Sequence, residues 1–317
     1  MKIIDQDLLK TKAFIDGKWT DSDDRSTFPV INPATGEVIC EVVSCGKNET
    51  RRAIEAAEKA RPSWQKIPIK EKANILRKWF ELMVEAQEDL AQILTAEQGK
   101  PLFESRGEIA YGANFIEWFA EEAKRVYGDV IPDPRPGKRI VVIKQPVGVV
   151  GAITPWNFPS SMLARKLGPA LAAGNTIVLK ASEFASAAML EFGSLIAEAG
   201  IPDGVVNIVT GHGDPCGRVL TSHPLVARIS FTGGPNAARH VIGNSTHNFA
   251  EVSLELGGKS PIIVFEDADI DSAVNGAAGG IFGASGQSCV AGSRPVSYTH
   301  LRAHETLRYL VCRLLLE

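Results

Sequence analysis

Two side chains that could act together in catalysis lie late in the sequence, Cys289 in "GQSCVAG" and Glu255 in "LELGGKSP". A cysteine thiolate is a strong nucleophile, and a carboxylate that follows a strand and precedes two glycines is a candidate general base. Each residue taken alone also has a simpler interpretation. Free cysteine is among the most frequently buried residue types, and the glutamate could be an exposed or capping side chain.

Five short apolar segments rich in β-branched residues indicate the strands that would have to position these side chains. They are VGVVGAIT (147–154), TIVLK (176–180), VVNIVTG (205–211), RISFTG (228–233) and PIIVF (261–265). Helical patterns such as 186–199 and 236–243 lie between most of them. Strands without polar alternation, separated by helices, predict an α/β fold with a Rossmann-like parallel sheet covered on both faces. In such sheets ligands bind beyond the carboxyl ends of the strands.

The segments that follow these strands contain polar residues or glycine. They supply Asn157, then Lys180 and Glu183, then Gly211 and Gly213, and finally Gly233 and Gly234. No GxGxxG motif occurs, so the ordinary dinucleotide-binding fingerprint is absent from the sequence. Glycines at the start of a helix could present backbone amides to a phosphate. A tight turn between strand and helix explains the same glycines equally well.

The amino-terminal half predicts packing elements. Residues 14–45 indicate short strands, with DG and NPATG as turns between them. The spacing of apolar residues predicts one helix over 70–95 and a second over 104–126. Residues 129–146 predict a β-hairpin, which could be an arm for oligomer contacts or a hairpin packed on its own domain.

The composition is that of an ordinary globular protein that handles small molecules. The chain has 317 residues, a net charge of −3 and 22% charged residues, so neither nucleic acid nor an anionic membrane is an expected partner. The sequence has no secretory signal and no apolar run long enough to span a membrane, which predicts a cytoplasmic location. The five cysteines form no CxxC pair, so neither a disulfide framework nor a metal site is predicted.

Five motifs, in this order, resemble those of the NAD(P)-dependent aldehyde dehydrogenases. They are PWNFP (155–159), LKASE (179–183), FTGG (231–234), LELGGKSP (254–261) and GQSCVAG (286–292). The resemblance covers the chain from about residue 13 to Arg294, and residues 97–132 and 153–174 are most similar to succinate-semialdehyde dehydrogenases. It implies a cofactor-binding domain over 1–254 and the start of a catalytic domain over 255–294. The 129–146 hairpin would be the oligomerisation arm of a homo-oligomer.

The resemblance also implies a mechanism and a set of cofactor-binding residues. Cys289 would attack the aldehyde carbon, and the Asn157 side-chain amide and the Cys289 backbone amide would hold the oxyanion. Hydride would pass to the nicotinamide, and Glu255 would activate the water that hydrolyses the remaining thioester. The implied cofactor-binding residues are Trp156, Asn157, Lys180, Glu183, Gly211, Gly233, Gly234 and Leu256.

Three positions bear on specificity. Glu183 implies NAD, with NADP as the alternative, because a carboxylate accepts both ribose hydroxyls and repels a 2′-phosphate. Gly234 stands where many relatives have a serine directed at the pyrophosphate. Arg165 matches an arginine that pairs with the distal carboxylate of succinate semialdehyde, although an arginine on a helix surface is a competing interpretation. A second such arginine is replaced by Gly283, so glutarate semialdehyde or a broad aldehyde range is the alternative substrate.

Other interpretations concern the class of protein and the integrity of the chain. A CoA-acylating relative or a non-catalytic protein that kept the fold would typically lack Glu255 or Cys289, and both are present. Family members continue well past Arg294, whereas residues 295–317 resemble peptide translated from a sequencing adapter, with a native amphipathic helix as the alternative. This tail contains Cys312 and the pair His300 and His304, which has metal-ligand spacing. A fragment of this kind is expected to be inactive.

Overall fold

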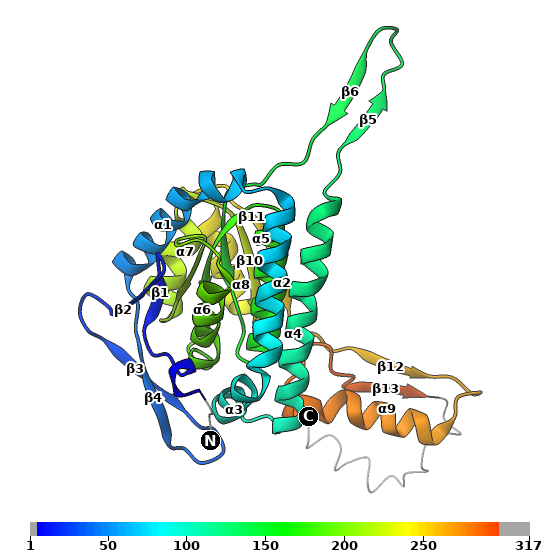
Figure 1. Ribbon diagram of the computed structural model, residues 1–317. Coiled ribbons are helices and arrows are strands. Elements are labelled where there is room, and N and C mark those ends of the chain that lie inside the picture. The colour runs from blue at the N-terminus through cyan, green and yellow to red at the C-terminus, as the bar shows by residue number, and fades with distance from the viewer. Residues whose placement is uncertain (1–4, 298–317) are drawn as a thin grey trace, which may run out of the picture. The chain divides into compact units, whose positions relative to one another are not determined.

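A computed structural model describes residues 5–297 (Figure 1). The chain divides into two compact units, Met1–Leu256 and Gly257–Glu317. Strand β11 (Glu251–Leu256) is the last element of the first unit. Glu255 and Leu256 therefore belong to the first unit, together with Asn157.

A seven-stranded sheet forms the centre of the first unit, in the order β11-β10-β7-β8-β9-β1-β2. The strands from β11 to β9 run parallel to one another, whereas β1 pairs antiparallel with both β9 and β2 at one edge. The other strands of this sheet are β1 (Ala13–Ile15), β2 (Lys18–Thr20), β7 (Val149–Ile153), β8 (Thr176–Lys180), β9 (Val206–Val209) and β10 (Val226–Gly233). The predicted α/β fold with a parallel sheet is confirmed.

Helices cover both faces of this sheet. Successive side chains of a strand point to opposite sides, and in β8 both sets are buried. In β8, Ile177 and Leu179 join the core that also contains residues of α5 and α6, whereas Val178 joins the core with residues of α1, α7 and α8. The helices of the unit are α1 (Lys47–Lys66), α2 (Ile69–Glu85), α3 (Gln87–Gln98), α4 (Leu102–Glu122), α5 (Pro159–Ala172), α6 (Ala187–Ala199), α7 (Arg218–Ser222) and α8 (Pro235–Ser245). Short turns of helix occur at η1 (Gln6–Leu8), η2 (Ala123–Arg125) and η3 (Gly213–Gly217).

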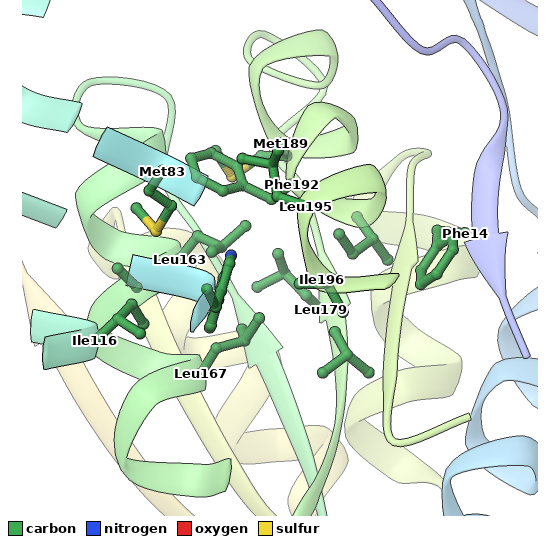
Figure 2. Packing of buried hydrophobic residues seen from close by; sticks show 14 of the residues in the cluster. Phe14, Met83, Ile116, Leu163, Leu167, Leu179, Met189, Phe192, Leu195 and Ile196 are labelled. Atoms are coloured by element: carbon green, nitrogen blue, oxygen red, sulfur yellow. The ribbon is translucent and has the colours of Figure 1, made fainter. Parts of the chain in front are cut away.

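The larger of the two cores joins the sheet to α2 through α6. Figure 2 shows Leu163 of α5, Phe192 of α6 and Leu179 of β8 within this one cluster. Trp64 and Trp79 are also fully buried there. Each large apolar side chain contributes roughly 1.5–3 kcal/mol when it is fully buried, so this core gives the strand ends a rigid support.

Two predicted helices differ from the observed ones. The helix expected over 70–95 is interrupted at Ala86, where α2 ends and α3 begins. The Ala86 N–H donates to the Leu82 carbonyl, and the Ala86 carbonyl accepts from the Leu90 N–H at 3.0 Å, so hydrogen bonding continues across the bend. The apolar spacing continues across it too, which is why periodicity alone predicted one helix. The helix expected over 104–126 is α4 followed by η2.

Two antiparallel hairpins lie outside the large sheet, β3 (Thr27–Ile31) with β4 (Val38–Val43) and β5 (Asp129–Pro132) with β6 (Arg139–Val142). Every residue of β5 and β6 is exposed. Figure 1 shows this second hairpin projecting away from the rest of the first unit. The hairpin predicted over 129–146 is therefore an extended arm and is not packed on its own domain.

Residues 257–297, the described part of the second unit, form a parallel strand pair and one helix. The elements are β12 (Pro261–Val264), α9 (Ile270–Phe282), the turn η4 (Gly283–Gly286) and β13 (Arg294–Ser297). The PIIVF strand pairs with β13 in this small sheet, so placing it in the large parallel sheet was wrong. The EVSLEL segment supplies the edge strand of the large sheet. An apolar run predicts a strand but carries no information about its neighbour.

The structure describes only the first three residues, 295–297, of the predicted non-native tail. Strand β13 crosses the expected join between Arg294 and Pro295, and that join stays a prediction. Cys312, His300 and His304 lie outside the described residues.

Candidate active site

A pocket of about 690 Å³ lies at the carboxyl ends of strands β7, β8 and β10. Five of the predicted cofactor-binding residues line it, namely Trp156, Lys180, Glu183, Gly233 and Gly234. Parallel pairing of β10 with β7 and of β7 with β8 brings together residues that are far apart in the sequence. This is the edge of a parallel sheet at which ligands bind.

A carboxylate and an ammonium group form one wall of the pocket. Lys180 ends β8, is almost completely buried, and its Nζ lies 3.1 Å from Glu183 Oε2. Burial would raise the pKa of Glu183, but the charge of Lys180 and hydrogen bonds lower it below its ordinary value. Glu183 is therefore an anionic acceptor at neutral pH, suited to a pair of hydroxyl groups.

The amino terminus of α8 forms another wall. A Cβ atom on Gly233 would lie 2.7 Å from the Phe231 ring, whereas one on Gly234 would meet no atom within 4 Å. Gly233 is thus required by packing, and Gly234 leaves open space. The first hydrogen bond of α8 runs from the Ala238 N–H to the Gly234 carbonyl at 3.1 Å, so the two preceding amides have no acceptor within the helix.

These walls fit a dinucleotide. No side chain caps α8, so its first amides suit a phosphate, and the positive end of the helix dipole adds to the attraction. The Glu183 carboxylate suits ribose hydroxyls. Both features lie in the same pocket, which favours phosphate binding over a turn that serves packing alone.

Three other residues predicted to bind the cofactor do not line this pocket. Gly211 has φ +138°, and a Cβ atom there would lie 2.7 Å from the Cys45 carbonyl oxygen, so packing explains its glycine. Leu256 is partly exposed at the end of β11. Asn157 follows the pocket residue Trp156 in the loop before α5.

Contacts with neighbouring residues fix the orientation of Asn157. Its Oδ1 accepts the Phe158 N–H at 3.0 Å, which leaves Nδ2 as the donor end of the amide. Its backbone carbonyl accepts Lys100 Nζ at 2.7 Å. An amide donor with a defined direction is what an oxyanion site needs.

Glu255 lies beside a lysine that the sequence analysis missed. Glu255 is exposed on β11, in register with Thr232 of β10. Lys166 of α5 is buried, and its Nζ lies 2.9 Å from Thr232 Oγ1 and 3.0 Å from Ser230 Oγ. Burial lowers the pKa of Lys166 to about 8, with Glu255 opposing the shift and Arg165 adding to it. Its position on α5 between Leu163 and Leu167, on the buried face, was the available sequence signal.

Cys289 lies in the second unit and is exposed, unlike Cys45 and Cys216, which are buried. Burial raises the pKa of the Cys45 thiol to about 12, so that residue is an inert core side chain. Ala284 and Ser285, shortly before Cys289, adopt left-handed backbone conformations at φ 52° and 57°. Such strain in non-glycine residues is typical of functional loops. The exposure of Cys289 contradicts its interpretation as a small core residue.

Arg165 is exposed on α5, and an aromatic ring supports it. Its guanidinium lies 5.2 Å from the centroid of the Phe115 ring, and Tyr111 packs edge-on against Phe115 at 4.8 Å. A guanidinium stacked in this way keeps its N–H donors available at the ring edge. The arrangement suits an anionic group on a ligand.

Between residues 5 and 297, two further features, a metal-binding cluster and a membrane-spanning helix, are absent. No group of three or more histidine, cysteine or acidic side chains there is arranged to hold a metal ion. None of the helices in that range is both long and apolar enough to cross a membrane.

The chain is similar in sequence and in structure to known proteins. The model of the aldehyde dehydrogenase family matches residues 19–306. The chain is 53% identical to the glutarate-semialdehyde dehydrogenase of Pseudomonas aeruginosa and 50% identical to the NADP(+) succinate-semialdehyde dehydrogenase of Escherichia coli, over 93% of this chain and 61% of each relative. A crystal structure of an Escherichia coli NADP-dependent enzyme has a TM-score of 0.92 at 50% identity, covering 93% of this chain and 62% of that one. The chain thus spans about three fifths of the length of these relatives.

Proposed function

Because the chain belongs to the aldehyde dehydrogenase family, we propose that the whole protein oxidises an aldehyde to a carboxylic acid, with NAD as the hydride acceptor. The observation that carries this proposal is the pocket at the strand ends, where the Lys180–Glu183 pair and the start of α8 face the same space. Lys180, Glu183 and the first amides of α8 would hold the dinucleotide. When bound, its nicotinamide would accept a hydride.

Residues of this chain carry out the remaining steps of the proposed reaction. The Cys289 thiolate attacks the aldehyde carbon, and the Asn157 amide and the Cys289 backbone N–H stabilise the resulting oxyanion. Loss of hydride leaves a thioester on the sulfur. Glu255 takes a proton from water, the hydroxide attacks the thioester carbonyl, and the acid is released as the C–S bond breaks. The exposure of Cys289 and the tethered amide of Asn157 support these roles.

The substrate we propose is a semialdehyde with a distal carboxylate, most simply succinate semialdehyde. Arg165 on its aromatic support offers the planar donor pair that a carboxylate accepts. Glutarate semialdehyde is the second candidate, because a 53% identical relative bears that name. A Cβ atom on Gly283 would meet no atom within 4 Å, which is compatible with a longer or less selective substrate.

We also propose that the whole protein is a homo-oligomer built through the β5–β6 arm. Every residue of both strands is exposed, including the apolar Val130, Ile131, Ile140 and Val141. A two-stranded ribbon with both edges unpaired is marginally stable alone, so a second copy would supply the missing partner.

Titration of NAD and NADP into this chain, followed by calorimetry, tests the cofactor proposal. We expect NAD to bind at least about tenfold more tightly, a difference of about 1.4 kcal/mol. Glu183→Ser should weaken NAD binding and reduce the preference for NAD over NADP. The control is Glu198→Ser, at an exposed position of α6, which should leave both affinities unchanged. Tighter binding of NADP by the unaltered chain would overturn the assignment.

Steady-state kinetics of a completed protein tests the reaction. Residues 1–294 are joined to the carboxyl-terminal part of the Pseudomonas aeruginosa relative, of which this chain covers 61%. We expect NAD-dependent oxidation of succinate semialdehyde, abolished by Cys289→Ser. Arg165→Met should raise KM for the semialdehydes but not for propanal. Binding of NAD without any turnover would favour a non-catalytic protein that kept the fold.

A further inference from the structure

A fully buried ion pair lies next to the loop that carries Asn157. Lys100 lies in the turn between α3 and α4, and Glu108 lies in α4. Their side chains are 0% and 1% exposed, and Lys100 Nζ lies 2.6 Å from Glu108 Oε2. Burying two charges costs several kcal/mol for each ion, and their mutual attraction often does no more than offset that cost. The stability of the fold alone therefore does not explain this pair.

The pair is bonded on both sides to the segment between Asn157 and Ser161. Lys100 Nζ donates to the Asn157 carbonyl at 2.7 Å, and Glu108 Oε1 accepts the Ser161 N–H, in the first turn of α5, at 3.1 Å. The same ammonium lies 3.9 Å from the centroid of the Phe158 ring. Two hydrogen bonds thus hold the backbone on both sides of Phe158, and the third contact holds its ring.

These contacts determine where the side chain of Asn157 can point. Its backbone carbonyl is held by Lys100, and its Oδ1 is held by the Phe158 N–H at 3.0 Å. The direction of Nδ2 therefore depends on the position of Lys100. Asn157 is followed by helix α5, which Glu108 holds through Ser161.

We propose that the Lys100–Glu108 pair is a positioning unit that aims the Asn157 amide at the oxyanion of the reaction. The inference rests on the proposed function, in which Asn157 is the oxyanion donor. Neither charged residue lines the proposed cofactor pocket. Their contribution is to hold the donor still before the charge develops, because a preorganised donor stabilises the transition state without reorganising during the reaction.

A pair that served folding alone would have a different signature. Its loss would lower stability and activity together, whatever residue stands at position 157. A positioning pair acts through Asn157, so its loss should have no further effect once the Asn157 amide is gone. A double-mutant cycle separates the two roles.

The test uses Lys100→Met with Glu108→Gln in the completed protein. Removing both charges avoids a buried carboxylate without a counterion, and the glutamine keeps an oxygen for the Ser161 N–H. We expect kcat to fall about 10- to 100-fold, since misplacing a reacting group by about 1 Å can cost about 100-fold. KM for NAD should stay within about twofold of its original value. Amide hydrogen exchange at Phe158 should become faster in the variant.

The cycle is completed with Asn157→Ala alone and with all three substitutions together. We expect the pair variant to lower kcat in the Asn157 protein and to have no effect in the Asn157→Ala protein. Equal losses in both backgrounds, or an unchanged kcat, would overturn the positioning role. If Asn157→Ala itself leaves kcat unchanged, the oxyanion assignment fails, and the positioning role fails with it.

The matched control is Arg106→Met. Arg106 lies on the same helix as Glu108 and forms an exposed ion pair with Glu88 at 2.7 Å. Exposed pairs contribute roughly 0–1 kcal/mol, so stability, kcat and KM should all stay close to those of the parent.

Discussion

The two units of the chain differ in how much core they contain. The first unit covers both faces of its sheet, and Trp64, Trp79 and Phe192 are 0% exposed. In the second unit, α9 has no buried residue, and Phe265 and Phe282 are 61% and 75% exposed. Apolar side chains stabilise a fold only when they leave water. The cofactor pocket therefore rests on a packed core, whereas the part of the second unit described by the structure, residues 257–297, buries little apolar surface.

Hydrogen exchange of the whole chain should show the largest difference between the two units. Amides of β7 and β8 should be protected close to the full free energy of unfolding, whereas those of α9 should exchange almost as fast as in an unfolded peptide. The reason is that backbone hydrogen bonds resist opening only where packing supports them. Mass spectrometry of peptic fragments provides the measurement. Comparable protection in α9 and β8 would remove the distinction between the units.

Truncating one apolar side chain in each unit makes the same comparison energetically. Leu163→Ala, at a residue that is 0% exposed, should lower the free energy of unfolding by about 2–5 kcal/mol, because a cavity is left in the core. Phe282→Ala should change it by less than about 0.5 kcal/mol. Urea unfolding followed by circular dichroism gives both values. A loss above 2 kcal/mol for Phe282→Ala would show that α9 is packed.

The first unit also buries charge, which should make its stability depend on pH. Burial raises the pKa of Glu97 to about 7, although the N–H groups of Ala188 and Ala187 oppose the shift. Burial and the nearby Glu97 raise the pKa of Glu191 as well, and neither Glu191 oxygen has a hydrogen-bond partner among residues 5–297. When folding raises the pKa of a carboxyl, its contribution to stability is fully present at a pH below its ordinary pKa. That contribution is lost as the pH rises through the pKa of the folded state.

The free energy of unfolding should therefore fall as the pH rises from 4.5 to about 7. Glu191→Leu should raise it at pH 8 by about 1–3 kcal/mol, since a buried polar group without a partner is removed, and should make the pH dependence shallower. Glu198→Leu, at an exposed position of the same helix, is the control and should do neither. Thermal unfolding across this pH range is the measurement. An unchanged slope in Glu191→Leu would mean that this carboxyl does not titrate with folding.

What the sequence predicted correctly was local. Apolar strands without polar alternation predicted the parallel sheet, and the residues after them include Lys180, Glu183 and Gly234, which line the pocket. What it missed depends on contacts between distant segments. Nothing in the sequence pairs Lys100 with the Asn157 carbonyl, 57 positions away, or Lys166 with the hydroxyl groups of Ser230 and Thr232, 64 and 66 positions away. The roles of Cys289, Glu255 and Asn157 stay predictions that rest on the family resemblance.

The smallest predicted effect concerns the surface of the first unit, where Phe115 supports Arg165. Phe115→Leu keeps an apolar side chain but removes the ring face, so the guanidinium loses an interaction of about 0.5–1 kcal/mol. In the completed protein, KM for succinate semialdehyde should rise about two- to fivefold, while KM for propanal and for NAD should not change. Trp118→Leu, at an exposed aromatic residue of the same helix, is the control. An equal rise in KM for propanal would show that Phe115 shapes access to the site and does not orient Arg165 toward a carboxylate.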